Sequence, residues 1–101
     1  MKLLNHEFEG STIHYYFEDN IELVVYEWGN GAKFWYQMGK LHRLDGPAVE
    51  YADGTKHWCQ MGKLHRLDGP AIEWSDGTKE WFIEGTYYSE QNFYQKVKEL
   101  K

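Results

Sequence analysis

Short runs of strand-forming residues, in which apolar and polar positions alternate, recur along the chain between turn-forming pairs. Alternation with a period of two is typical of strands that bury one face. The runs 11–17 (STIHYYF) and 21–28 (IELVVYEW) lie on either side of the polar segment 18–20. We therefore expect these two runs to form an N-terminal hairpin that covers the open edge of the sheet that follows.

A segment of 23 residues is repeated in tandem. Residues 37–59 and 60–82 are identical at 18 aligned positions and share the run QMGKLHRLDGPA letter for letter. Such units stack on their neighbours, and the end copies are usually degenerate. We expect one domain, 1–101, whose parts are N-terminal capping strands (1–23), a degenerate repeat (24–36), two full repeats (37–59 and 60–82), and a partial repeat with a C-terminal helix (83–101).

Each unit contains an Asn-Gly or Asp-Gly pair, at 30–31, 53–54 and 76–77. These pairs favour two-residue type I′ turns, in which both central residues have a positive φ. Such a turn would place Val49 opposite Trp58 and Glu50 opposite His57. The predicted fold is mainly β: a single-layer twisted antiparallel meander of tandem hairpins of about 23 residues each.

In this register one sheet face combines an aromatic ladder with a row of lysines. Such a face could bind a protein partner, because Trp and Tyr are common interface anchors and a lysine can lie over an aromatic ring. This candidate binding face consists of Trp28, Lys33, Tyr51, Lys56, Trp74 and Lys79.

A helix is predicted at the C-terminus. Ser89 is a suitable N-cap, and Phe93, Val97 and Leu100 recur at the spacing of an apolar helix face. We expect the amphipathic helix to fold back on the sheet. The tryptophans expected to form the core beneath it are Trp35, Trp58 and Trp81.

Charge and cysteine content restrict the partners and the compartment. The formal charge of -5 opposes binding to nucleic acids and to anionic membranes. The N-terminus lacks the apolar stretch of a secretion signal, and a single cysteine, Cys59, excludes an internal disulfide. Cys59 aligns with Phe82, so we expect it to pack as a small apolar side chain. These features predict a soluble cytoplasmic protein.

The repeat resembles a known family. A hairpin unit with GK, a histidine two residues on, and then DG followed by a lysine is similar to the MORN repeat, and MGKLHRLDGPAIEWSDGTKEW resembles its bacterial and bacteriophage variant. The resemblance covers residues 24–94. It implies a meander of hairpins used for protein contacts rather than catalysis. If the chain is viral, it implies a host protein as partner, including a component of a defence system, in the host cytoplasm.

The repeated LHRLDGPA segment supplies a candidate binding rim. In one interpretation the arginine pairs with the aspartate, which also accepts backbone N–H groups, and the segment is a structural turn. In the other, the histidines and arginines bind a small phosphorylated or nucleotide-like ligand. The rim consists of His42, Arg43, Asp45, His65, Arg66 and Asp68.

Enzymatic chemistry has little support in the sequence. It contains no nucleophile motif and no glycine-rich phosphate loop, and the spacing of His42, His57 and His65 resembles no standard metal-ligand set. We expect no catalytic residue, metal or cofactor. Three hypotheses remain: a protein-binding module, a protein that sequesters a small anion, and a protein that self-assembles, for example as a homodimer, through strand edges.

Overall fold

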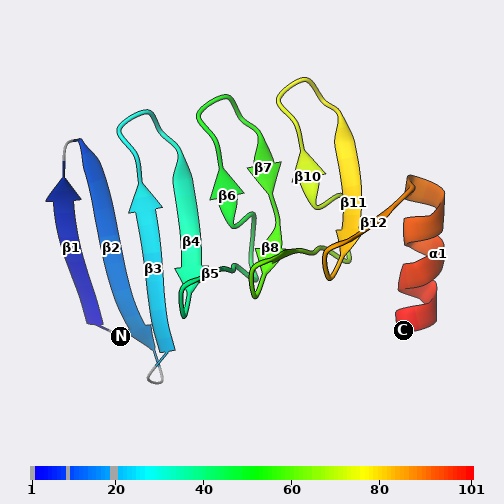
Figure 1. Ribbon diagram of the computed structural model, residues 1–101, viewed down its shortest axis with the longest axis horizontal. Helices are drawn as coiled ribbons and strands as arrows, with labels where there is room; N and C mark the ends of the chain where they lie inside the picture. Colours follow the sequence, from blue (N-terminus) through cyan, green and yellow to red (C-terminus); the bar gives the residue numbers. More distant parts are fainter. Residues whose placement is uncertain (1, 9, 19–20) are drawn as a thin grey trace.

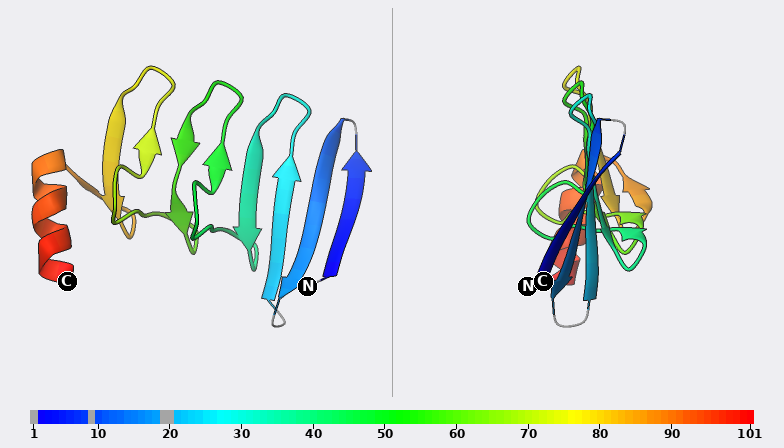
Figure 2. Two further views of the ribbon diagram at one scale, coloured as in Figure 1. Left: turned by 180° about the vertical axis from the view of Figure 1, so that it is seen from behind. Right: turned by 90° about the vertical axis from the view of Figure 1, so that its left-hand side faces the viewer.

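The computed structural model describes residues 2–8, 10–18 and 21–101 as an antiparallel β-meander followed by one α-helix (Figure 1). The molecule measures 43 × 34 × 16 Å, and the end-on view in Figure 2 shows a twisted slab one sheet thick. The predicted mainly-β meander with a C-terminal helix is confirmed.

Three strands form the N-terminal end of the sheet: β1 (Lys2–Phe8), β2 (Ser11–Glu18) and β3 (Ile21–Glu27). The predicted hairpin corresponds to β2 and β3, although the tip of its turn, at 19–20, lies outside the described residues. Strand β1 adds a further antiparallel partner to β2. Strand β3 pairs with β4 (Lys33–Gln37), so the N-terminal strands cover the edge of the first repeat as expected.

The repeats contribute short strands to the same sheet. Its order is β1-β2-β3-β4-β6-β7-β10-β11-β12, with β5 beside β4, while β8 and β9 form a separate hairpin. The bounds of the remaining strands are β5 Lys40–Leu41, β6 Val49–Glu50, β7 Lys56–His57, β8 Cys59–Gln60, β9 Lys63–Leu64, β10 Ile72–Glu73, β11 Lys79–Ile83 and β12 Thr86–Tyr88.

The Asp-Gly turns are one residue longer than predicted. The N–H of Tyr51 donates to the carbonyl of Thr55 at 2.9 Å, so the loop contains three residues, and only Gly54 has a positive φ, of 95°. The Asp53 carboxylate accepts the N–H of Thr55 at 2.9 Å and stabilises this loop. The loop is the three-residue hairpin type that ends in a glycine bulge. The predicted type I′ turn at this position is wrong.

The additional loop residue changes the register. Val49 lies opposite His57, and Glu50 lies opposite Lys56. A one-residue shift moves every side chain of one strand to the other face of the sheet. The predicted pairing of Val49 with Trp58 is therefore wrong. The directly paired positions now form a row of alternating charge across six strands, made of Glu27, Lys33, Glu50, Lys56, Glu73 and Lys79.

True two-residue turns occur at the Met-Gly pairs. Met61 and Gly62 have φ values of 50° and 82°, and their flanking residues Gln60 and Lys63 are paired. A hairpin loop of two residues with positive φ is a type I′ turn. Each full repeat thus contains a second short hairpin in addition to the predicted one.

Replacing Met61 with asparagine is expected to raise the free energy of unfolding by about 1 kcal/mol. A residue with a Cβ is disfavoured at positive φ, but the short polar side chain of asparagine can offset this cost by hydrogen bonding to the local backbone. Met61 is exposed, so little packing is lost. Urea titration of the variant measures the gain. Met61→Ala is the control, since alanine has the Cβ but no polar group that could hydrogen-bond to the local backbone, and an equal gain in that variant would contradict the explanation.

The predicted helix is present as α1 (Glu90–Leu100), and the Ser89 hydroxyl accepts the N–H of Asn92 at 3.2 Å. Phe93 is fully buried. The helix packs against β11 and β12, beyond the last hairpin (Figure 1). It covers the end of the sheet and does not cover Trp35 or Trp58. The expectation that these two tryptophans form a core beneath the helix is wrong.

Candidate binding surfaces

The LHRLDGPA segments form two corner loops, 42–47 and 65–70, each organised by an arginine. The Arg66 guanidinium lies over the ring of Trp58, 3.9 Å from its centroid. Its Nε donates to Asp68 at 2.8 Å, and its Nη1 donates to the Pro70 carbonyl and to Glu73, both at 3.0 Å. One side chain therefore joins the loop to the next strand and covers a tryptophan.

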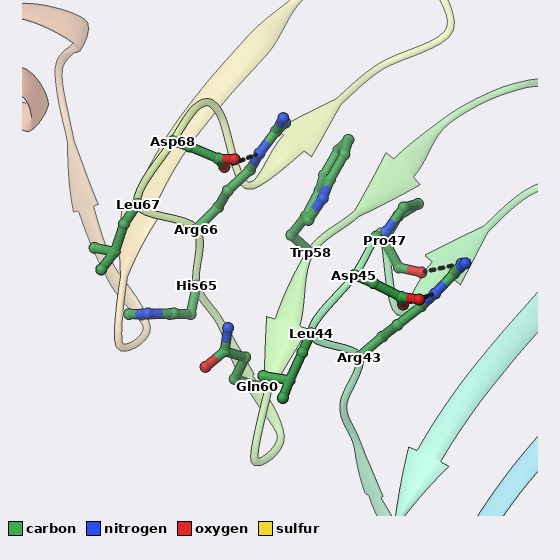
Figure 3. A pocket seen from close by; sticks show the side chains of 11 residues that line it. Arg43, Leu44, Asp45, Pro47, Trp58, Gln60, His65, Arg66, Leu67 and Asp68 are labelled. Carbon is green, nitrogen blue, oxygen red and sulfur yellow. Dashed lines mark hydrogen bonds and ion pairs between the residues drawn. The ribbon is translucent and has the colours of Figure 1, made fainter.

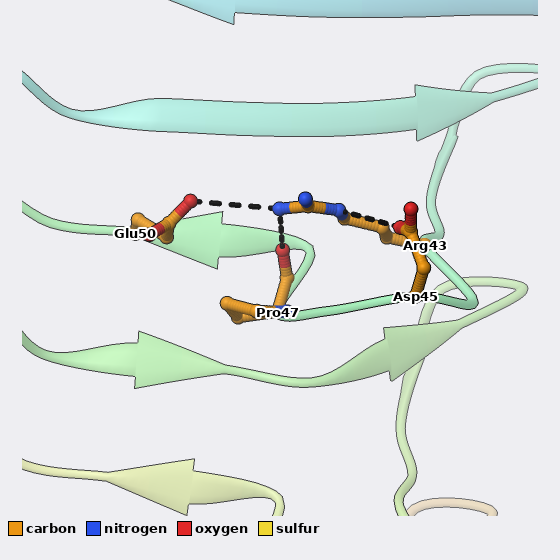
Figure 4. Close-up of polar contacts among 4 residues, drawn as sticks. All are labelled: Arg43, Asp45, Pro47 and Glu50. Atoms are coloured by element: carbon orange, nitrogen blue, oxygen red, sulfur yellow. Dashed lines mark hydrogen bonds and ion pairs between the residues drawn. The ribbon is translucent and has the colours of Figure 1, made fainter.

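Arg43 repeats this arrangement (Figure 4). It lies 4.0 Å from the ring centroid of Trp35 and donates to Asp45 at 2.9 Å, to the Pro47 carbonyl at 3.2 Å and to Glu50 at 3.5 Å. The predicted arginine–aspartate pair is present in both loops. Within the part of the chain that the structure describes, neither aspartate accepts a backbone N–H. The predicted hydrogen bonds from backbone N–H groups to Asp45 and Asp68 are therefore wrong.

The rim histidines connect successive units. His42 Nδ1 accepts the N–H of Met61 at 2.9 Å, and His65 Nδ1 accepts the N–H of Glu84 at the same distance. These bonds link a corner loop to the type I′ turn that follows 19 residues later. Among the described residues, no group of three or more His, Cys, Asp or Glu side chains could hold a metal ion.

A groove of about 670 Å³ separates the two corner loops, and Trp58 lies between the two arginines (Figure 3). The exposed side chain of Leu44 lines it. Two guanidinium groups here pair with four carboxylates, those of Asp45, Glu50, Asp68 and Glu73. The surplus of carboxylates over guanidinium groups disfavours an anionic ligand in this groove, although, among the described residues, the hydrogen bonds of each arginine involve only its Nε and Nη1.

The other sheet face carries a continuous row of rings, which we call the aromatic row. Neighbouring rings meet edge to face with centroids 5.3 to 6.5 Å apart, a favourable geometry for aromatic pairs. Trp28, Tyr51 and Trp74 are 49%, 41% and 41% exposed. The row consists of Trp28, Phe34, Tyr51, His57 and Trp74.

His57 lies in the aromatic row between Tyr51 and Trp74. Burial lowers the pKa of His57 from its ordinary value of 6.5, and the carboxylate of Glu80 partly opposes this. Its Nε2 is buried without a hydrogen-bond partner among the described residues. The lowered pKa favours the neutral imidazole, which behaves here as a flat, mostly apolar ring.

Two aspartates line the loops beside the aromatic row. Hydrogen bonds from the backbone of Thr55, and to a smaller extent from its side chain, hold the pKa of Asp53 below its ordinary value of 3.8. Hydrogen bonds from the side chain of Thr78, and to a smaller extent from its backbone, lower the pKa of Asp76. In the degenerate repeat the equivalent acceptor is uncharged, because Asn30 accepts the N–H of Ala32 at 3.0 Å.

Acidification is expected to destabilise the fold through these loops. A carboxyl whose pKa is lower in the folded than in the unfolded protein stabilises the fold at pH values above its pKa in the unfolded protein. This contribution is lost as the pH falls through the pKa of the carboxyl in the folded protein. The Asp53→Asn and Asp76→Asn double variant keeps the acceptor oxygen, as Asn30 does. Its urea midpoint should fall less than that of the wild type between about pH 6 and pH 3. An equal fall in both proteins would contradict this explanation.

Cys59 packs as a small apolar side chain, as expected. It is 4% exposed, and burial raises the pKa of its thiol to about 11. A thiol with such a raised pKa is a poor nucleophile at neutral pH.

The structure brings together only part of the predicted binding face. Trp28, Tyr51 and Trp74 share one face, but Lys33, Lys56 and Lys79 lie in the charged row on the opposite face, so none of these three lysines lies beside the rings. The predicted face of alternating rings and lysines is wrong. Sequence reasoning missed Phe34 and His57 as members of the row, because the aligned position holds Phe, His and Glu in successive units.

No family model, curated protein or solved structure matches the chain. In the described residues, no helix has the length and apolar character required to cross a membrane.

Proposed function

We propose that the protein is a non-enzymatic protein-binding module that contacts its partner through the aromatic row. The observation that carries the proposal is the exposure of three large aromatic side chains in one continuous line. Trp and Tyr are the side chains most often found as energetic anchors of protein interfaces. A single-sheet slab also presents such a line as a flat, accessible surface.

The exposed area of the molecule supports this proposal. The accessible surface is 6814 Å², whereas a compact monomer of 12.1 kDa exposes about 6,000 Å². The radius of gyration is 15.0 Å, compared with about 13 Å for a compact chain of this length. The excess of about 800 Å² reflects the single-layer architecture, which leaves the face that carries the aromatic row uncovered.

The identity of the partner forms the second part of the proposal. The repeated LHRLDGPA segment resembles the repeat sequence of MORN-variant proteins of bacteriophages. On that resemblance we propose that the protein acts in the cytoplasm of a host cell and binds a host protein, such as a component of a defence system.

Affinity purification from the cells that naturally make the protein tests this function. We expect quantitative and native mass spectrometry to detect a polypeptide bound to the wild type and reduced at least about tenfold with the Trp28→Ala and Trp74→Ala double variant. The matched control, Leu44→Ala with Leu67→Ala, removes exposed side chains from the corner loops and should retain the polypeptide. A bound mass below one kilodalton, self-association alone, or loss only in the control would overturn the proposal.

A further inference from the structure

The aromatic row has a regular spacing set by the repeat. Trp28 follows β3, Tyr51 follows β6 and Trp74 follows β10, so each is two strands away from the next. Neighbouring strands lie about 4.7 to 4.9 Å apart, which places the exposed rings about 9.4 to 9.8 Å apart along a line that crosses the strands.

A polyproline II helix has a matching period. It has three residues per turn and rises about 3.1 Å per residue, so side chains on one of its edges recur about every 9.3 Å. Domains that bind proline-rich peptides dock this helix against aromatic-lined surfaces. We propose that the segment recognised by the aromatic row is a proline-rich, basic peptide in the polyproline II conformation, lying across the strands. This inference rests on the proposed function and specifies its partner.

The surface between the rings suits such a peptide. His57 and Thr55 help to line a hollow of about 460 Å³ between Tyr51 and Trp74, and this volume exceeds that of a proline ring. Polyproline II leaves its carbonyls unpaired. Tyr51 Oη and Trp28 Nε1 have no hydrogen-bond acceptor among the described residues and can donate to those carbonyls.

Charge determines the remaining side chains of the peptide. Asp53 and Asp76 line the hollows on either side of Trp74, one in each full repeat, and each uses one oxygen for its turn. The two carboxylates are separated by one repeat, which matches one turn of the peptide helix. Lys56 and Lys79 lie on the opposite face. A basic residue at every third position of the peptide therefore complements this face.

Isothermal titration calorimetry with the 12-residue peptide (Pro-Pro-Arg)₄ tests the inference. We expect it to bind at least about tenfold more tightly than the flexible peptide (Gly-Ser-Arg)₄ or the acidic peptide (Pro-Pro-Glu)₄. Trp28→Ala and Trp74→Ala should each weaken binding about tenfold, and the control Lys56→Ala on the other face should leave it unchanged. Circular dichroism of each variant confirms that it is folded.

The outcomes separate this inference from the proposed function. Equal binding of the three peptides, or no binding of any, overturns the inference, whereas the proposed function stands if the captured polypeptide still depends on Trp28 and Trp74. Sedimentation that shows a dimer lost on Trp74→Ala also overturns it, because a second copy of the chain would then cover the aromatic row. Binding of (Pro-Pro-Arg)₄ that survives both tryptophan substitutions likewise overturns it.

Discussion

Replacing Arg66 with alanine is expected to lower the free energy of unfolding by about 3 kcal/mol. The side chain covers Trp58 at 3.9 Å and donates three hydrogen bonds, to Asp68, Pro70 and Glu73. A partly desolvated cation–π contact contributes up to about 2 kcal/mol, and a hydrogen bond that involves a charged group contributes about 1.5 to 3 kcal/mol. Because a small domain has about 5 to 15 kcal/mol of stability, this loss is large.

Urea titration measures this loss, and Asp68→Ala is the matched control. Asp68 is the most exposed partner of Arg66, with 87% of its side chain accessible, so its removal should cost less than about 1 kcal/mol. The same pair of substitutions at Arg43 and Asp45 should reproduce the difference. If Arg66→Ala leaves the midpoint unchanged, the arginine is not the structural centre of its loop, and its donors are available to a ligand.

Replacing Phe93 with alanine is expected to lower the free energy of unfolding by about 3 to 5 kcal/mol, because this large side chain is fully buried. It attaches α1 to the last hairpin, so its loss should also expose the end of the sheet. Thermal unfolding together with sedimentation measures both effects. The control is Tyr94→Ala, which removes a neighbouring ring that is 46% exposed. Equal destabilisation by the two substitutions would contradict the assigned role of the helix.

The N-terminal hairpin and the terminal helix could be predicted from the sequence because their signals are local, whereas the short hairpins at the Met-Gly turns were not predicted. Alternation identified β2 and β3, and Ser89 with Phe93 identified α1. The register could not be predicted, since an Asp-Gly pair suits both a two-residue and a three-residue loop. The hydrogen bond from the N–H of Thr55 to Asp53 accompanies the three-residue loop. The one additional loop residue moves the side chains of one strand to the opposite face of the sheet.

Other features depend on contacts that are distant in sequence. Met61 adopts a conformation that methionine disfavours, and its N–H is bonded to His42, 19 residues earlier. The stacking of Arg43 on Trp35 likewise joins a loop to a separate strand. For the candidate site, the sequence identified Trp28 and Trp74 but paired them with lysines that lie on the other face. Local patterns thus locate side chains along the chain but do not assign them to a face.

The five tryptophan indole N–H groups allow the most direct test of the proposed binding face. Trp28 and Trp74 belong to the aromatic row, whereas Trp35 and Trp58 lie under arginines and Trp81 Nε1 is buried. In a ¹H–¹⁵N NMR titration with the captured partner protein, we expect the indole signals of Trp28 and Trp74 to shift while those of the other three remain in place. Shifts confined to Trp35 and Trp58 would place the partner on the arginine-covered face and contradict the account.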